Sequence, residues 1–75
     1  MIIHMTIKTP ETNAVIKEIN VAMTKTGVVQ ADNTAPSEYD FVFFKGDRGV
    51  YYYESPDFPN HVLSNLYKFA QNLVA

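Results

Sequence analysis

Residues 38–54 read EYDFVFFKGDRGVYYYE, and this stretch is expected to decide the fold. Two runs rich in aromatic and β-branched residues flank the polar tetrapeptide Gly46-Asp47-Arg48-Gly49. Phe, Tyr and Val favour strands, and a short polar segment bounded by glycines between two such runs is typical of a β-hairpin. The sequence therefore predicts a hairpin that holds most of the chain's aromatic residues, namely Tyr39, Phe41, Phe43, Phe44, Tyr51, Tyr52 and Tyr53.

The register of this hairpin decides which side chains share a face. If Gly46 pairs with Gly49, Tyr52 shares a face with Phe41 and Phe43. If Gly49 instead takes a left-handed bulge position after a type I turn, the register shifts by one residue, and the tyrosines at 51 and 53 take that place. We expect the bulged register, because Asp-Arg suits a type I′ turn poorly and a glycine suits the bulge.

Composition predicts one compact α+β domain over residues 1–75. Hydrophobic residues make up 47% of the chain and charged residues 19%, which is typical of a globular protein. A net charge of −2 with six basic residues makes nucleic-acid binding an unfavoured reading. The chain lacks cysteine, an apolar run of the ~20 residues that a membrane helix needs, and a basic leader before its apolar start. We therefore expect a cytoplasmic protein that does not bind membranes.

The first third of the chain predicts a strand and then a helix. Residues 2–8 alternate apolar and polar side chains, as a half-buried strand does. Thr9 and Pro10 suit the start of a helix, and Gly27 suits the position just after its end. The residues between them place an apolar stripe at helical spacing, formed by Val15, Ile16, Ile19, Ala22 and Met23. We expect a helix over 10–26, although 15, 19, 21 and 23 also fit the alternation of a strand that Lys17 interrupts.

The rest of the chain predicts a short strand, a loop, the hairpin and a second helix. Residues 28–31 favour a strand, and the polar segment 32–37 favours a loop. Pro56 and Pro59 end the second strand of the hairpin. Residues 61–75 form the clearest helical pattern, with an apolar stripe of Val62, Leu66, Phe69, Ala70 and Leu73.

These elements predict an α+β fold in the order β-α-(β)-β-β-α. It would hold a small antiparallel sheet of three to four strands, with two helices packed on one face. The opposite face of the sheet would then be aromatic and partly exposed.

The sequence gives no support for catalysis, a cofactor or a metal. His4 and His61 are the only histidines, and their spacing places neither beside a nucleophile nor beside a second metal ligand. The carboxylates are scattered, although Asp40 and Glu54 could meet across the ends of the hairpin. The glycines at 46 and 49 precede no helix, so they form no phosphate-binding loop. We therefore expect a protein that is not an enzyme.

The aromatic hairpin is the candidate contact surface. Tyrosine supplies a large apolar ring with a polar tip and is enriched where proteins bind each other. An arginine at a turn is well placed to anchor a partner, although a solvated turn residue is the simpler reading of Arg48. The predicted partner-binding residues are Tyr51, Tyr52, Tyr53, Phe41, Phe43, Asp47 and Arg48.

Two segments resemble known families. Residues 50–60, VYYYESPDFPN, resemble the strand and Pro-Asp-Leu-Pro-Gly turn of HicB-type antitoxins, although a helical pattern follows here where that family has another strand. The run from Phe41 through Tyr53 to Pro56 and Leu66 is similar to KTSC-type domains, whose hairpin leads through a proline into a helix; the residues that name that domain are absent. Each likeness covers about a third of the chain, and we assign no family.

The leading hypothesis is a small non-enzymatic interaction protein that binds a protein partner through the aromatic hairpin face. Modulators and inhibitors, such as those of phages and mobile elements, are proteins of this type. The alternatives are a homodimeric structural or antitoxin-like protein, in which the free face meets its own copy, and, less favoured, a single-stranded nucleic-acid binder or a small-molecule site that uses Tyr67 or His61.

Overall fold

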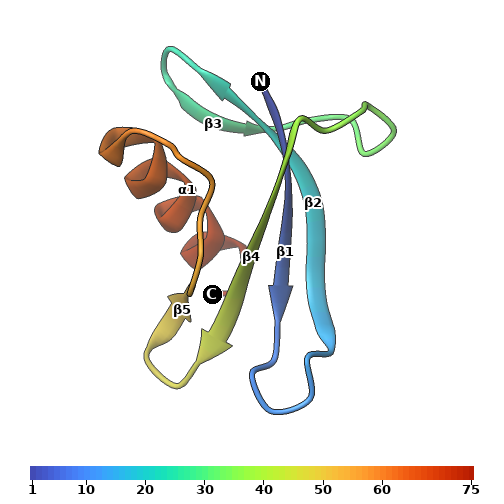
Figure 1. The fold of residues 1–75 in the computed structure, drawn as a ribbon, viewed down its shortest axis with the longest axis vertical. Helices are drawn as coiled ribbons and strands as arrows, with labels where there is room; N and C mark the ends of the chain where they lie inside the picture. Colours follow the sequence, from blue (N-terminus) through green and yellow to red (C-terminus); the bar gives the residue numbers. More distant parts are fainter.

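The computed structural model describes residues 1–75 as one curled sheet of five strands with a single helix. The strands are β1 (Ile2–Lys8), β2 (Val15–Thr24), β3 (Gly27–Gln30), β4 (Tyr39–Gly46) and β5 (Gly49–Tyr51), and the helix is α1 (Asn60–Leu73). The spatial order is β3-β2-β1-β4-β5. The sheet curls like half a barrel, and α1 lies on its concave side (Figure 1).

The sheet is mixed because the chain crosses over between β3 and β4. The β1–β2, β2–β3 and β4–β5 pairs are antiparallel, whereas β1 and β4 are parallel neighbours with Met5 opposite Phe41. The predicted fold, two helices on an antiparallel sheet of three to four strands, is therefore wrong. The predicted first strand, the hairpin and the C-terminal helix are confirmed within a residue or two, apart from the second strand of the hairpin, which ends at residue 51.

The segment predicted as the first helix is instead the strand β2. The residues expected to begin a helix form a tight turn, in which Asn13 N–H donates to the Thr9 carbonyl at 2.9 Å and Asn13 takes a positive φ of 59°. The strand alternation from Val15 to Met23 prevails because β-branched side chains suit a pleated surface. Lys17 interrupts that alternation where the strand is exposed, so its charge stays in water.

The hairpin register also differs from the expected one. Gly46 pairs with Gly49 and Phe44 pairs with Tyr51, so the register does not shift. Gly49 has a φ of 117°, while Asp47 and Arg48 have no positive φ. The turn is therefore neither type I′ nor type II′. Gly49 provides the positive φ that the turn needs, and the strand register does not shift.

The core lies between the concave face of the sheet and the helix. Ile3, Met5 and Ile7 of β1 are fully buried there, as are Phe41 and Phe43 of β4. The helix contributes Val62, Leu66 and Ala70, the buried members of its predicted apolar stripe. Since alternate residues of β1 and β4 are used in this way, the side chains between them face outward.

Candidate functional site

The convex face of the sheet is the surface that the helix leaves uncovered. Even-numbered residues of β1 and β4 lie on it, because alternate residues of both strands are buried in the core, namely Ile3, Met5, Ile7, Phe41 and Phe43. Cross-strand pairing places His4 beside Asn20 on one side and beside Asp40 on the other. It also places Phe44 between Lys8 and Tyr51. The face thus carries a polar group over β1 and β2 and an aromatic group over β4 and β5.

The aromatic group consists of Phe44, Tyr51 and Tyr53, which we call the open-face aromatic cluster. The ring centroids lie 5.8 Å apart for Phe44 and Tyr51, 5.3 Å for Phe44 and Tyr53, and 5.5 Å for Tyr51 and Tyr53. These separations are within the range of favourable aromatic pairs. The Tyr53 side chain raises the pKa of Tyr51 above the ordinary value of a phenol, chiefly through hydrogen bonding. Tyr53 is 76% exposed, so the cluster presents its apolar surface to solvent.

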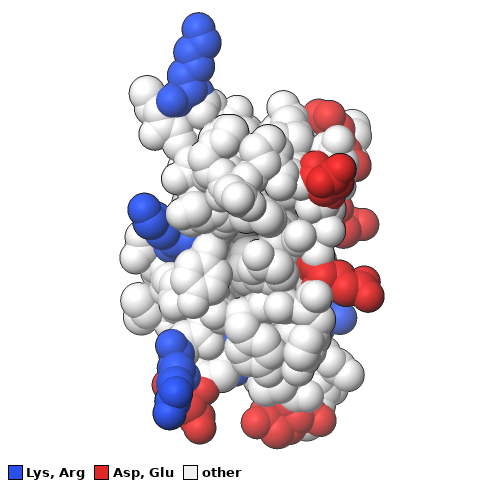
Figure 2. Space-filling view, turned by 60° about the vertical axis from the view of Figure 1, so that its left-hand side comes forward, with Lys and Arg blue, Asp and Glu red and all other residues white.

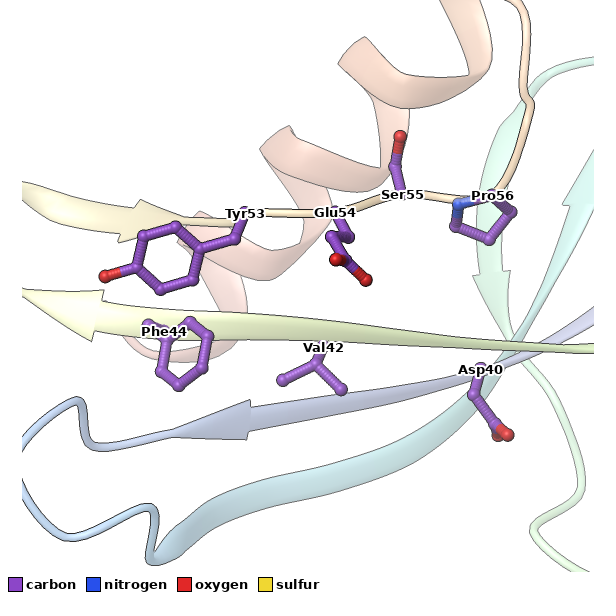
Figure 3. A pocket seen from close by; sticks show the side chains of 7 residues that line it. All are labelled: Asp40, Val42, Phe44, Tyr53, Glu54, Ser55 and Pro56. Atoms are coloured by element: carbon purple, nitrogen blue, oxygen red, sulfur yellow. The ribbon is translucent and has the colours of Figure 1, made fainter.

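A shallow groove of about 510 Å³ adjoins the cluster. It is lined by Asp40, Val42, Phe44, Tyr53, Glu54, Ser55 and Pro56. Figure 3 shows that the segment after β5 runs alongside β4, with Glu54 reaching over Val42 and Ser55 pointing away from the strand. The contact between the rings of Phe44 and Tyr53 closes one end of the groove.

The groove exists because β5 separates from β4 after Tyr51. The N–H of Val50 donates to Oε1 of Gln71 at 3.2 Å and therefore does not bond to β4. In an antiparallel ladder the hydrogen-bonded pairs alternate with unbonded ones, so Phe44 and Tyr51 form a bonded pair. The next bonded pair would join Val42 to Tyr53, but residues 52–56 make no backbone hydrogen bond with β4.

The polar group on the convex face is centred on His4. Its Nδ1 lies 2.7 Å from Oδ1 of Asn20, and its Nε2 lies 2.7 Å from Oε1 of Glu18. The hydrogen bond with Asn20 raises the pKa of His4, and Glu18 and the Asp40 charge act in the same direction. Partial burial opposes them but does not prevail. His4 is therefore a positively charged centre on this face at mildly acidic pH.

Asn20 joins this group to the loop between β3 and β4. Only 3% of the residue is exposed, and its Nδ2 lies 3.1 to 3.4 Å from the carbonyl oxygens of Asp32, Asn33 and Ala35. The side chain of Asn33 in turn accepts a hydrogen bond from the backbone N–H of Asn20 at 3.1 Å. Hydrogen bonds from the Thr34 N–H and hydroxyl lower the pKa of Asp32 and hold the loop turn. These hydrogen bonds hold the loop in a defined conformation against the sheet.

The structure divides the predicted partner-binding residues among three environments. Phe41 and Phe43 lie in the core, where their rings stack 4.4 Å apart. Tyr52 is half-buried and packs edge-on against both of them. The convex face and the exposed hairpin tip hold the others, namely Tyr51, Tyr53, Asp47 and Arg48. A partner on the convex face therefore meets only the residues of the third environment.

Sequence reasoning missed Phe44, His4 and Asn20 as members of this face. The sequence predicts His4 only as an isolated structural residue. Parallel pairing places it beside Asp40, and that pairing joins segments more than thirty positions apart, so no local pattern reveals it. Phe44 could have been found by choosing the unslipped register, since it then pairs with Tyr51. His61 lies exposed on the first turn of α1. No three His, Asp or Glu side chains gather closely enough to hold a metal ion.

Charges are separated on the side of the molecule that Figure 2 shows. Most of the acidic side chains in that view lie along one edge and most of the basic ones along the opposite edge. Among the groove residues, Asp40 and Glu54 are acidic and none is basic. Neither of these two carboxylates forms a salt bridge, since the two salt bridges of the chain join Glu38 to the N-terminus and Glu18 to His4.

Fold and site together define a small α+β domain with an open, partly aromatic sheet face and an acidic groove at its edge. Comparison with family models, with curated proteins and with solved structures found no match to this chain. The single helix is too short and too polar to span a bilayer.

Proposed function

We propose that this chain is a non-enzymatic interaction domain that binds a protein partner through the convex face of its sheet and acts as a cytoplasmic modulator or inhibitor. The observation that carries the proposal is the open-face aromatic cluster. Three large rings in mutual contact lie on the one sheet face that the helix does not cover. Aromatic side chains of this kind dominate the energetics of protein interfaces, because they bury a large area at a low cost in side-chain entropy.

The surroundings of the cluster suit a specific contact. Asp47 and Arg48 are exposed at the adjacent hairpin tip and provide charges of both signs. Lys8 lies beside Phe44, and Asp40 lies at the far end of the same strand. An aromatic centre surrounded by charged residues matches the usual arrangement of an interface, in which an apolar core is enclosed by a polar rim.

Comparative capture with matched variants tests this proposal. The purified chain and the double variant Tyr51→Ser with Tyr53→Ser would be used as baits in extracts of the source cells. A double variant on the exposed side of α1, Lys68→Ser with Asn72→Ser, is the control, since both residues are exposed and the helix lies on the opposite side of the sheet. We expect a protein that is retained by the wild-type and control baits and lost by the tyrosine variant. Identical capture by all three baits would contradict the proposal.

A homodimer is the second candidate, and the outer edge of β2 favours it. β3 pairs only with Val21–Thr24, so residues 15–19 of β2 have no strand on their outer side. Unpaired strand edges are sites of association between chains, although a lysine on the edge, here Lys17, opposes it. Light scattering over a hundredfold range of concentration decides the matter. A dimer that the Val15→Ser with Ile16→Ser variant dissociates would support this second reading.

A further inference from the structure

We propose that the groove beside β4 binds an extended basic peptide, which adds a strand to the free edge of β4. This inference rests on the proposed function, since it names the class of partner and the way in which that partner is recognised. It is carried by three observations, namely unpaired backbone groups, an acidic and aromatic lining, and the absence of a cation among the groove residues.

The backbone of β4 is half unpaired along the groove. Alternate residues of a strand direct their N–H and C=O groups to the same side. Phe44 directs its groups toward Tyr51, so Val42 and Asp40 direct theirs to the same edge, beyond the last bonded pair of the ladder. The odd-numbered residues of β4 direct theirs to β1, which forms the parallel ladder on the other side. From Asp40 to Phe44 the edge extends about 13 Å, at 3.3 Å per residue, which accommodates a short strand.

The chain's own next segment does not occupy this edge. Pro56 has no N–H to donate, and the Pro56 carbonyl accepts a hydrogen bond from Phe58 N–H at 2.8 Å as the chain turns toward the helix. Glu54 reaches over the groove near Val42, and Asp40 lies at its open end (Figure 3). No backbone hydrogen bond joins residues 53–56 to β4, so the edge of β4 beside the groove stays free.

The lining selects the charge of the occupant. At one end, Phe44 and Tyr53 provide aromatic surface; toward the other end, Asp40 and Glu54 provide two carboxylates without a salt-bridge partner. A lysine or arginine of the added strand would pair with these carboxylates, while an apolar residue two positions along would contact the rings. A second copy of this chain fits less well, because pairing of two β4 edges brings further carboxylates into the same groove. This combination of main-chain pairing with alternate side-chain contacts is the usual mode of strand addition.

Synthetic peptides test the proposal directly. The probes are acetyl-Thr-Lys-Thr-Val-Thr-Ile-Thr-amide, its sequence reversed, and both peptides with Glu in place of Lys. We expect one of the Lys peptides to bind and both Glu peptides to fail. N-methylation of the peptide amides that face β4 would abolish binding, whereas N-methylation of the alternate amides would leave it. Binding that survives both methylation patterns, or no binding by either Lys peptide at millimolar concentration, would overturn the proposal.

Hydrogen exchange of the protein's own backbone amides tests the same contact. In the free chain we expect Asp40 and Val42 amides to exchange quickly and Phe41 and Phe43 amides slowly. The Lys peptide should slow exchange at Val42 by tenfold or more. Asp40→Asn with Glu54→Gln should weaken the Lys peptide about three- to tenfold, as expected for two exposed charge contacts. If the chain instead forms a dimer in light scattering and Val42 exchange slows when it does, the edge of β4 binds a second copy. That result would overturn the proposal that it binds a peptide.

The two proposals fail in different ways. Suppose that the Tyr51→Ser with Tyr53→Ser bait loses its protein partners and the Asp40→Asn with Glu54→Gln bait keeps all of them. This result would support the convex face as the interaction surface and would contradict strand addition in the groove. If the Lys peptide binds but no captured protein depends on the two tyrosines, the groove would be supported and the proposed function contradicted.

Discussion

Asn20 fixes the protonation of His4. The Oδ1 of Asn20 lies 2.7 Å from Nδ1 of His4, while Nδ2 of Asn20 faces three backbone carbonyls. The Asn20 amide can therefore only accept at Oδ1, so Nδ1 of His4 carries a proton. The Glu18 carboxylate, 2.7 Å from Nε2, also requires a donor. Both ring nitrogens donate only in the imidazolium form, so this arrangement is satisfied by positively charged His4.

The first prediction is a pH dependence of stability that follows from this pair. Because the pKa of His4 is raised above its ordinary value of about 6.5, its contribution to folding is complete below that value. The contribution is lost as the pH rises through the raised pKa. Urea unfolding at a series of pH values should show the wild type losing stability over this window, relative to His4→Gln. A parallel pH profile for the two proteins would contradict the prediction. Titration of the His4 ring by NMR in Glu18→Gln should show a lowered pKa.

The second prediction concerns the loop that Asn20 holds. Asn20→Ala removes the donor to the carbonyls of the loop and leaves the loop polar groups partly buried without a partner. We expect a loss of about 2 kcal/mol in the free energy of unfolding. Asn72→Ala, at an exposed helix position, is the control and should change stability by less than about 0.5 kcal/mol. Denaturant melts of the two variants measure the difference, and equal effects would remove Asn20 as the anchor of the loop.

The sequence predicts those elements whose pattern of apolar residues lies within the element itself. The strand at 2–8, the aromatic hairpin and the C-terminal helix carry their own periodicity, and all three are present. The segment 10–26 carries two periodicities at once. Its start and stop residues, Thr9, Pro10 and Gly27, serve turns as well as helix ends. The neighbour that decides between them is β1, which pairs with β2 across the turn.

The candidate site was less predictable because it depends on pairing between distant segments. The parallel contact of β1 with β4 places His4 beside Asp40, and no local pattern reports a parallel crossover. A choice of register by one residue then decides which tyrosines lie outside. Tyr51 and Tyr53 could be named as a pair from the sequence, but their assignment to the convex face required the observed pairing of Gly46 with Gly49.

The third prediction separates the two hairpin registers by stability. In the observed register Tyr52 packs edge-on against Phe41 and Phe43, whereas Tyr53 is largely exposed. Tyr52→Ser should therefore cost about 2 kcal/mol of unfolding free energy. Tyr53→Ser should cost less than about 0.5 kcal/mol. The shifted register requires the opposite ranking, so chemical denaturation of the two single variants distinguishes them without any partner.

The fourth prediction concerns the turn that sets this register. Gly49→Ala places a side chain at a φ of 117°, where its Cβ would lie 2.6 Å from the Gln71 side-chain amide. The strain and the displaced hydrogen bond from Val50 to Gln71 should together cost about 2 kcal/mol. Gly27→Ala is the matched control, because Gly27 has a φ of 128° with no atom within 4 Å of the added Cβ. It should show the backbone strain alone, about 1 kcal/mol. Equal losses for the two variants, measured by thermal and urea unfolding, would mean that Gln71 does not brace the hairpin against the helix. A larger loss for Gly49→Ala, together with faster amide exchange at Val50, would show that the helix holds β5 in the position from which the groove opens.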